Sequence, residues 1–180
     1  MMYFQYTDEH LNNLNQDYAV YSVNEEFSSR KKTKQVVEKS NIDPKNETNT
    51  ITTSDGQEFR VIATKSHKET GFDGLAVAPI VNGEPDYKNV AVIAAGTDPG
   101  SPTKIDVGTA VAERESGLSP QYYVADRFVK EIMDDPRYEV SQLSGYSQGS
   151  YMLKVGAKYH IPTTTFNAWF FYNSLSNEEK

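Results

Sequence analysis

The sequence contains no cysteine. Disulfides, thiolate catalysis and cysteine zinc sites are therefore excluded, although the compartment is left open. Its histidines are few and scattered, at His10, His67 and His160, with no His-x-x-x-His pair, so we expect no metal site and no cofactor. No run of about 18 apolar residues occurs, and residues 1–8 lack the basic and apolar segments of a secretory signal. We therefore expect a soluble protein, either cytoplasmic or exported by a signal-independent route.

Basic residues are fewer than acidic ones: the sequence has 18 Lys and Arg against 25 Asp and Glu, which gives a net charge of −7. An acidic chain lacks the positive surface that binding to nucleic acid or to anionic membranes requires, so neither is expected as a partner. The basic cluster at 30–34 is interpreted as the solvated face of a helix rather than a binding site.

Helical and strand patterns alternate along the second half of the chain, which is typical of an α/β fold with a mostly parallel sheet. Its 180 residues suffice for one domain, in which 1–40 supply helices that cover one sheet face and 58–169 form the core. The predicted helices are 9–20 (capped by Asp8), 30–39, 105–115, 120–134 (apolar stripe Tyr123, Phe128, Val129, Ile132) and 150–158. The predicted strands are 58–64, 74–81, 90–95, 138–144 and 161–166, with a polar loop over 40–57 and turns at Ser54-Asp55-Gly56 and Asn82-Gly83.

The most informative stretch is Gly145-Tyr146-Ser147-Gln148-Gly149, a G-x-S-x-G match. It lies between a predicted strand and a predicted helix, which is the context that a nucleophile elbow requires. Such a turn places a serine in a strained backbone conformation, and side chains at Gly145 and Gly149 would collide with neighbouring elements. The alternative interpretation is a Gly/Ser-rich loop without chemistry. We take Ser147 as the candidate nucleophile.

A serine that attacks an ester needs two backbone N–H groups directed at the developing oxyanion. Gln148, the residue after the candidate nucleophile, is placed to supply one of them. The loop that follows the apolar strand 90–95 is placed to supply the other, from Thr97.

These blocks resemble the α/β-hydrolase superfamily, and within it the lipase-like families close to class 3 lipases. The resemblance covers 58–169, and its blocks are 90–98, the helix 120–134, the strand, elbow and helix 138–151, and the strand end at Thr165-Phe166-Asn167-Ala168. It implies an incomplete three-layer sandwich in which Ser147 is the nucleophile and the N–H groups of Thr97 and Gln148 form the oxyanion hole. It also implies hydrolysis of a carboxylic ester, such as a lipid or another acyl ester.

The chain departs from this family at three points. Ala95 stands where the family has an arginine, and Gln148 stands where it commonly has a leucine. More importantly, the triad Asp and His follow the elbow in this family, whereas the only histidine after Ser147 is His160. In a parallel sheet His160 would lie at the end opposite the serine, and we expect His10 and His67 on the surface.

Two accounts of the missing residues follow. In the first, the chain is the N-terminal portion of a lipase domain whose C-terminal segment supplies the Asp and the His, or a naturally short hydrolase that takes them from a partner chain. In the second, the chain is a non-catalytic binding or assembly module with a hydrolase-like sheet, whose incomplete edge needs a partner strand. A phosphate-binding loop at 145–149 is disfavoured, since the Gly-Lys-Ser/Thr ending of a P-loop is absent.

Overall fold

The computed structural model describes residues 4–15, 50–67, 69–96, 119–168 and 175–179. The predicted helices 30–39 and 105–115, and residues 16–20 of the predicted helix 9–20, lie outside these ranges. None of the helices within them is long and apolar enough to cross a membrane.

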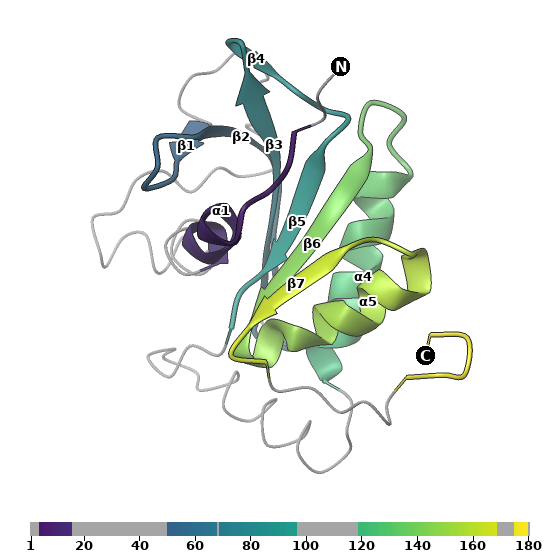
Figure 1. Ribbon diagram of the computed structural model, residues 1–180. Coiled ribbons are helices and arrows are strands. Elements are labelled where there is room, and N and C mark those ends of the chain that lie inside the picture. Colours follow the sequence, from purple (N-terminus) through teal and green to yellow (C-terminus); the bar gives the residue numbers. More distant parts are fainter. Residues whose placement is uncertain (1–3, 16–49, 68, 97–118, 169–174, 180) are drawn as a thin grey trace.

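The described chain forms a seven-stranded mixed sheet in the order β1-β2-β3-β5-β6-β7, with β4 paired to β3 (Figure 1). The strands are β1 Thr50–Thr52, β2 Glu58–His67, β3 Phe72–Val81, β4 Glu84–Pro85, β5 Val90–Ala94, β6 Val140–Tyr146 and β7 Thr163–Phe166. The parallel arrangement is confined to β5, β6 and β7, whereas β1 to β4 and the β3–β5 pair are antiparallel. The α/β class is thus confirmed as a mixed sheet with its parallel part on one side. The expectation of a mostly parallel sheet is wrong, because β1 to β5 follow one another through short connections and pair antiparallel.

Helices cover both faces of the sheet (Figure 1). Helix α1, Asp8–Asn13, packs its buried Leu11 against one face. Helices α4, Pro120–Met133, and α5, Met152–Tyr159, pack against the other face. The short 3-10 helix η4, Ser147–Tyr151, joins β6 to α5.

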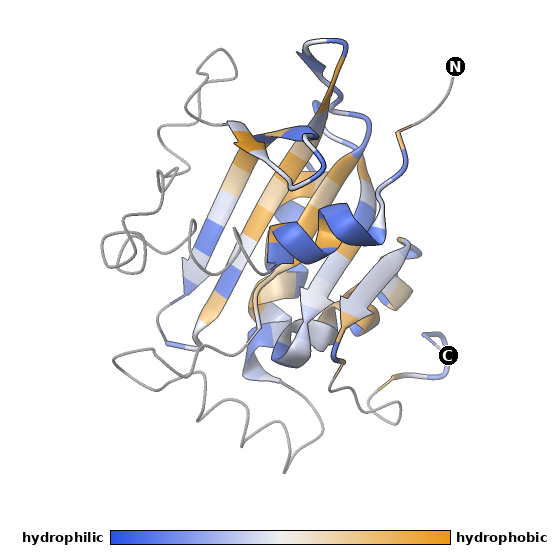
Figure 2. Cartoon of the chain, turned by 60° about the vertical axis from the view of Figure 1, so that its left-hand side comes forward, coloured by the Kyte–Doolittle hydropathy of each residue, from blue (hydrophilic) through white to orange (hydrophobic). Residues whose placement is uncertain are grey.

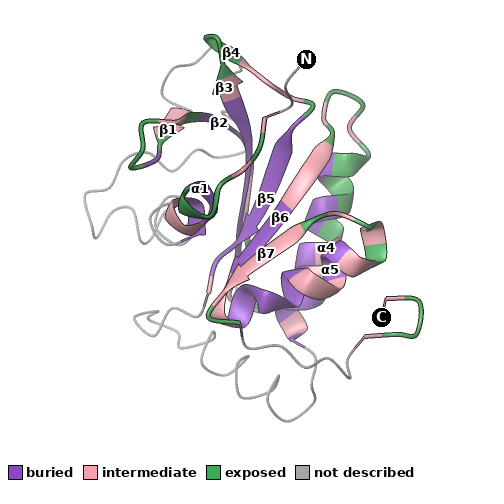
Figure 3. Cartoon of the chain, viewed as in Figure 1, coloured by how far each residue is buried: buried purple, intermediate pink, exposed green. Residues whose placement is uncertain are grey.

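Two apolar clusters lie on the two faces, with β5 between them. All five residues of β5 are buried, as expected for a strand covered on both sides (Figure 3). Phe72, Phe128 and Val155 belong to the cluster under α4 and α5, whereas Leu11 and Phe59 belong to the cluster under α1. Figure 2 shows the hydrophobic residues concentrated on the strands and the outer side of α1 hydrophilic.

Local sequence signals explain several helix starts. Ser119 caps α4 by accepting a hydrogen bond from the Gln121 N–H, and Pro120 occupies the first turn. The cap of α1 is Thr7 and not Asp8, because the Thr7 hydroxyl accepts from the His10 N–H while Asp8 already lies within the helix. The predicted stripe of α4 is wrong at Tyr123, which is 60% exposed, and the neighbouring Tyr122 is buried instead.

The strand predictions differ from the structure mainly at the strand ends. The predicted loop 40–57 contains β1, which forms because it pairs with the start of β2. Strand β2 ends at His67, three residues later than predicted. Strand β3 begins at Phe72, two residues earlier than predicted. Asn82-Gly83 forms the predicted turn with positive φ at both residues, and Gly56 in the turn at 54–56 also has positive φ.

Candidate active site

The candidate nucleophile lies at the carboxyl end of the parallel strands, where β5, β6 and β7 all terminate. Strand β6 runs to Tyr146 in extended conformation, and Ser147 then begins η4 with a φ of 50°. A non-glycine residue with positive φ is uncommon and costs free energy, so the observation points to a functional constraint at this turn. The predicted strand-to-helix turn at Ser147 is therefore present.

Both glycines of the motif are required by close packing. A Cβ atom on Gly145 would collide with the carbonyl oxygen of Gly149. A Cβ atom on Gly149 would lie 2.8 Å from the carbonyl oxygen of Ala94 and 2.9 Å from that of Ala95. The predicted steric role of these two glycines is confirmed, because a side chain at either position would force the helix away from the sheet.

Ser147 is half-buried, and within the described residues its hydroxyl makes no hydrogen bond. Gln148 is fully buried directly after it. Thr97, the other expected oxyanion donor, lies outside the described residues. The preceding Gly96 is described, and a Cβ atom there would lie 2.7 Å from the Tyr146 carbonyl oxygen. The loop after β5 therefore begins in contact with the elbow.

None of the three histidines reaches Ser147. His160 caps α5 in left-handed conformation and precedes β7, so it lies at the opposite end of the parallel strands, as predicted. The prediction that His10 lies on the surface is wrong, because it is only 6% exposed and its Nε2 atom lies 2.6 Å from Oδ2 of Asp55. This contact is made at the turn between β1 and β2, also away from Ser147.

His67 is the one histidine at the carboxyl end of the parallel strands. A single row of paired residues crosses the sheet there, through Lys65, Gly74, Ala94 and Gly145. Three strand spacings of about 4.8 Å separate β2 from β6, which gives about 14 Å. Half-buried His67 instead has its Nδ1 atom 3.0 Å from the Thr70 hydroxyl. The described residues thus supply a serine without a histidine base.

Comparison of the chain with protein-family models, with curated proteins and with solved structures gives no match. The resemblance to lipase-like α/β-hydrolases therefore depends on the residues of the motif blocks and on the geometry at Ser147.

Buried polar contacts tie the elbow helix to the rest of this end of the sheet. The Tyr151 hydroxyl donates to Oε1 of Gln121 at 3.2 Å, and Nε2 of Gln121 donates to the Thr70 carbonyl at 2.9 Å. Tyr151 and Gln121 are each 2% exposed. These contacts link η4, the start of α4 and the β2–β3 hairpin, and they were not predicted because their members are far apart in sequence.

A further residue that sequence reasoning missed is Asn167, which directly follows β7. Its Nδ2 atom donates to the Tyr146 hydroxyl at 2.7 Å, and its φ is 49°. The sequence signal was the Thr165-Phe166-Asn167-Ala168 block, which indicated a strand end but no role for the asparagine.

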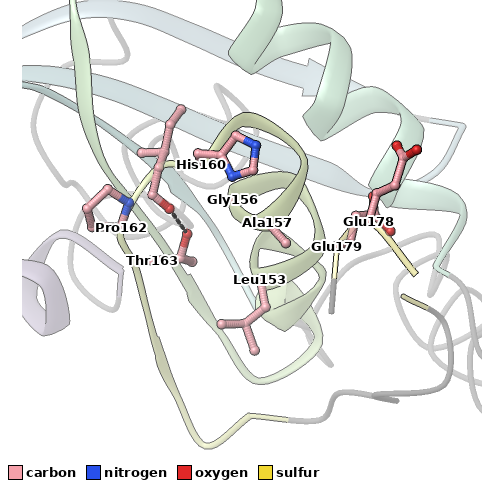
Figure 4. Close-up of a pocket in the computed structure, with 9 residues that line it drawn as sticks. Leu153, Gly156, Ala157, His160, Pro162, Thr163, Glu178 and Glu179 are labelled. Atoms are coloured by element: carbon pink, nitrogen blue, oxygen red, sulfur yellow. Dashed lines mark hydrogen bonds between the residues drawn. The ribbon is translucent and has the colours of Figure 1, made fainter. Parts of the chain in front are cut away.

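A separate pocket of about 470 Å³ lies between α5, the start of β7 and segment 175–179 (Figure 4). His160, Thr163, Glu178 and Glu179 contribute to its lining, and Ser147 does not. The Lys154 Nζ atom lies 2.6 Å from Oε2 of Glu179. Of the two carboxylates that line the pocket, that of Glu179 is therefore already paired with a cation. In the ranges that the structure covers, no three His, Cys, Asp or Glu residues are grouped to hold a metal ion.

Proposed function

We propose that this protein is a serine carboxylic-ester hydrolase of the lipase-like α/β-hydrolase type, acting through an acyl-enzyme on Ser147. The observation that carries the proposal is the positive φ of Ser147 at the carboxyl end of the parallel strands, between two glycines that cannot carry a Cβ atom. A strained serine between close-packed glycines is the arrangement that exposes a nucleophilic hydroxyl above a sheet.

The proposed reaction has two halves. The Ser147 Oγ atom attacks the carbonyl carbon of the ester, its proton passes to a base, and the alcohol leaves with that proton while the acyl group stays on Oγ. A water molecule then attacks the acyl-enzyme, so that a carboxylic acid leaves and the serine regains its proton. The N–H groups of Thr97 and Gln148 would stabilise the oxyanion in both halves, each worth about 2.7–4 kcal/mol.

The base and its orienting carboxylate come from elsewhere in this proposal. The chain has three histidines, and the described geometry gives none of them contact with Ser147. A further polypeptide segment or a partner chain would therefore supply the Asp and His. The substrate class is an acyl ester, such as a lipid, and no cofactor takes part.

The test is covalent labelling of the full-length protein, together with any partner chain that supplies the base, by a fluorophosphonate probe, and hydrolysis of p-nitrophenyl esters by the same preparation. We expect Ser147→Ala to abolish labelling and Ser141→Ala to leave it unchanged, because Ser141 lies near the start of β6 at the far end of the strand. Mass spectrometry should place the adduct on Ser147. An adduct on another serine, or no labelling of the wild-type protein, would refute the proposal.

A second candidate is a non-catalytic binding or assembly module, favoured by one observation. Strand β7 is the last strand of the described sheet, and its four residues are all half-buried rather than buried (Figure 3). An uncharged edge strand can accept a further strand from another segment. Sedimentation of the full chain, combined with the labelling experiment, decides between the two candidate functions. A monomer that is labelled at Ser147 excludes a purely structural role.

A further inference from the structure

Two neighbouring strands end in the same unusual backbone conformation. Ser147, after β6, has a φ of 50°, and Asn167, after β7, has a φ of 49°. Strands β6 and β7 are parallel, and Tyr146 pairs with Phe166, so the two strained residues follow one register row at the carboxyl end of the sheet. Strained positions of this kind gather at functional sites.

A hydrogen bond links these two strand ends. The Asn167 Nδ2 atom donates to the hydroxyl oxygen of Tyr146 at 2.7 Å. Tyr146 is the residue directly before Ser147, so the contact acts on the backbone at the N-terminal side of the elbow. Asn167 is exposed and Tyr146 is half-buried, so the fold does not need this bond to cover a core polar group.

The same tyrosine also meets the end of β5. A Cβ atom at Gly96 would lie 3.0 Å from the Tyr146 Cδ1 atom and 2.7 Å from its carbonyl oxygen. The ring and backbone of Tyr146 therefore lie next to Gly96, the second residue after β5. Through one side chain, the ends of β5, β6 and β7 are connected beside Ser147.

We propose that Asn167 is a positioning residue for the esterase site, acting through Tyr146 to fix the spacing between Ser147 and Gly96 in the loop after β5. This inference rests on the proposed function, in which that loop supplies one oxyanion donor. Asparagine suits the position because it accepts positive φ more readily than most side chains and provides an N–H donor. Loss of the bond leaves the elbow glycines packed but lets Tyr146, and with it Ser147, shift relative to Gly96.

The substitutions can separate the backbone from the side chain. Asn167→Gly keeps the positive φ without strain and removes the donor, whereas Asn167→Ala removes the donor and adds backbone strain. Tyr146→Phe removes the acceptor alone. The matched control is Asn82→Gly, because Asn82 also has positive φ, at 52°, but lies in the β3–β4 turn at the other end of the sheet.

The experiment measures the rate of fluorophosphonate labelling at Ser147, kcat and KM for a p-nitrophenyl ester, and the thermal midpoint for each variant. We expect Asn167→Gly and Tyr146→Phe each to lower the labelling rate and kcat by roughly 3- to 10-fold, the effect of one hydrogen bond. KM should change less than about twofold, and the double variant should be no slower than either single variant, since the two side chains act as a unit.

The outcomes are distinguishable. A wild-type protein that is not labelled at Ser147 overturns the proposed function, and this inference with it. A labelled wild type whose Asn167→Gly variant reacts at the same rate overturns the positioning role alone. A lower thermal midpoint in Asn167→Gly with unchanged kcat, or an equal loss of kcat in Asn82→Gly, also overturns it.

Discussion

The ring of Phe72, at the start of β3, meets the ring of Phe128 in α4 with 6.2 Å between centroids and 68° between ring planes. Both side chains are about 1% exposed. This edge-to-face contact fixes α4 against the end of the sheet that carries Ser147. Gly74 lies beneath it, where a Cβ atom would be 2.6 Å from the Phe72 ring.

Phe128→Ala should destabilise the protein by about 3–5 kcal/mol, because it removes a buried ring and leaves a cavity under α4. Tyr123→Ala, on the same helix but 60% exposed, should change the free energy of unfolding by about 0.5 kcal/mol or less. Urea denaturation of the two variants measures both values. Equal losses of free energy of unfolding in Phe128→Ala and Tyr123→Ala would contradict the placement of α4 on the sheet.

Gly145→Ala should cost about 3 kcal/mol or more, because the added methyl group meets the backbone carbonyl of Gly149 and the elbow cannot shift without moving α5. Gly83→Ala is the control, since nothing lies within 4 Å of its Cβ position and only the positive φ of 82° is strained. That strain costs about 1–2 kcal/mol. Chemical denaturation should therefore give Gly145→Ala a clearly lower free energy of unfolding than Gly83→Ala. The reverse order would refute the close packing of the elbow.

Much of the fold could be predicted where local sequence and tertiary packing agree. Strand β5 is apolar throughout and is buried on both faces, and α4 carries its own cap and its own Pro120. The strand-to-helix turn at Ser147 was predictable because a close-packed turn of this kind requires residues without a Cβ atom on both sides of the serine, and glycines stand at 145 and 149.

The remainder depends on contacts that a local pattern does not contain. In β2 the register with β3 shifts between Val61 and Ala63, so neighbouring Ile62 and Ala63 both join the cluster under α4, where a regular strand would place them on opposite faces. A bulge of this kind changes which face a side chain occupies. His10 is buried through Asp55, 45 residues away, and Asn167 reaches Tyr146 across 21 residues.

His10 should stabilise the protein through two separable contacts. Its Nδ1 atom accepts from the Thr7 N–H at 3.2 Å in a capping box, which leaves the proton on Nε2 to be donated to Asp55. His10→Ala loses both contacts and should cost about 2–3 kcal/mol. His10→Gln restores the reciprocal cap, since glutamine is the usual partner at this position, and should recover about 1 kcal/mol. Equal stability of the two variants in urea would rule out the capping role.

Segment 175–179 should leave α5 as the pH falls. Burial raises the pKa of Glu179, but the hydrogen bonds from Lys154 and Ser176 outweigh it, so the pKa lies below its ordinary value of 4.5. A depressed carboxyl pKa means that the contact contributes fully above pH 4.5 and is lost as the pH falls through the lower, folded value. The measurement is an NMR titration of the Glu179 carboxyl carbon and the Ser176 amide, which should change together in acid.

Variants of Lys154 and Glu179 test whether their ion pair causes this pH dependence. Lys154→Met removes the main cation and should return the Glu179 pKa toward 4.5, and Glu179→Gln should abolish the acid transition of the Ser176 amide. Glu178→Gln is the control, because exposed Glu178 makes no ion pair in the part of the chain that the structure describes and should leave the transition unchanged. Since the Lys154 and Glu179 side chains are only 13% and 11% exposed, added salt should weaken the contact less than it weakens a surface pair. A Glu179 titration that Lys154→Met does not alter would show that the ion pair does not hold this segment.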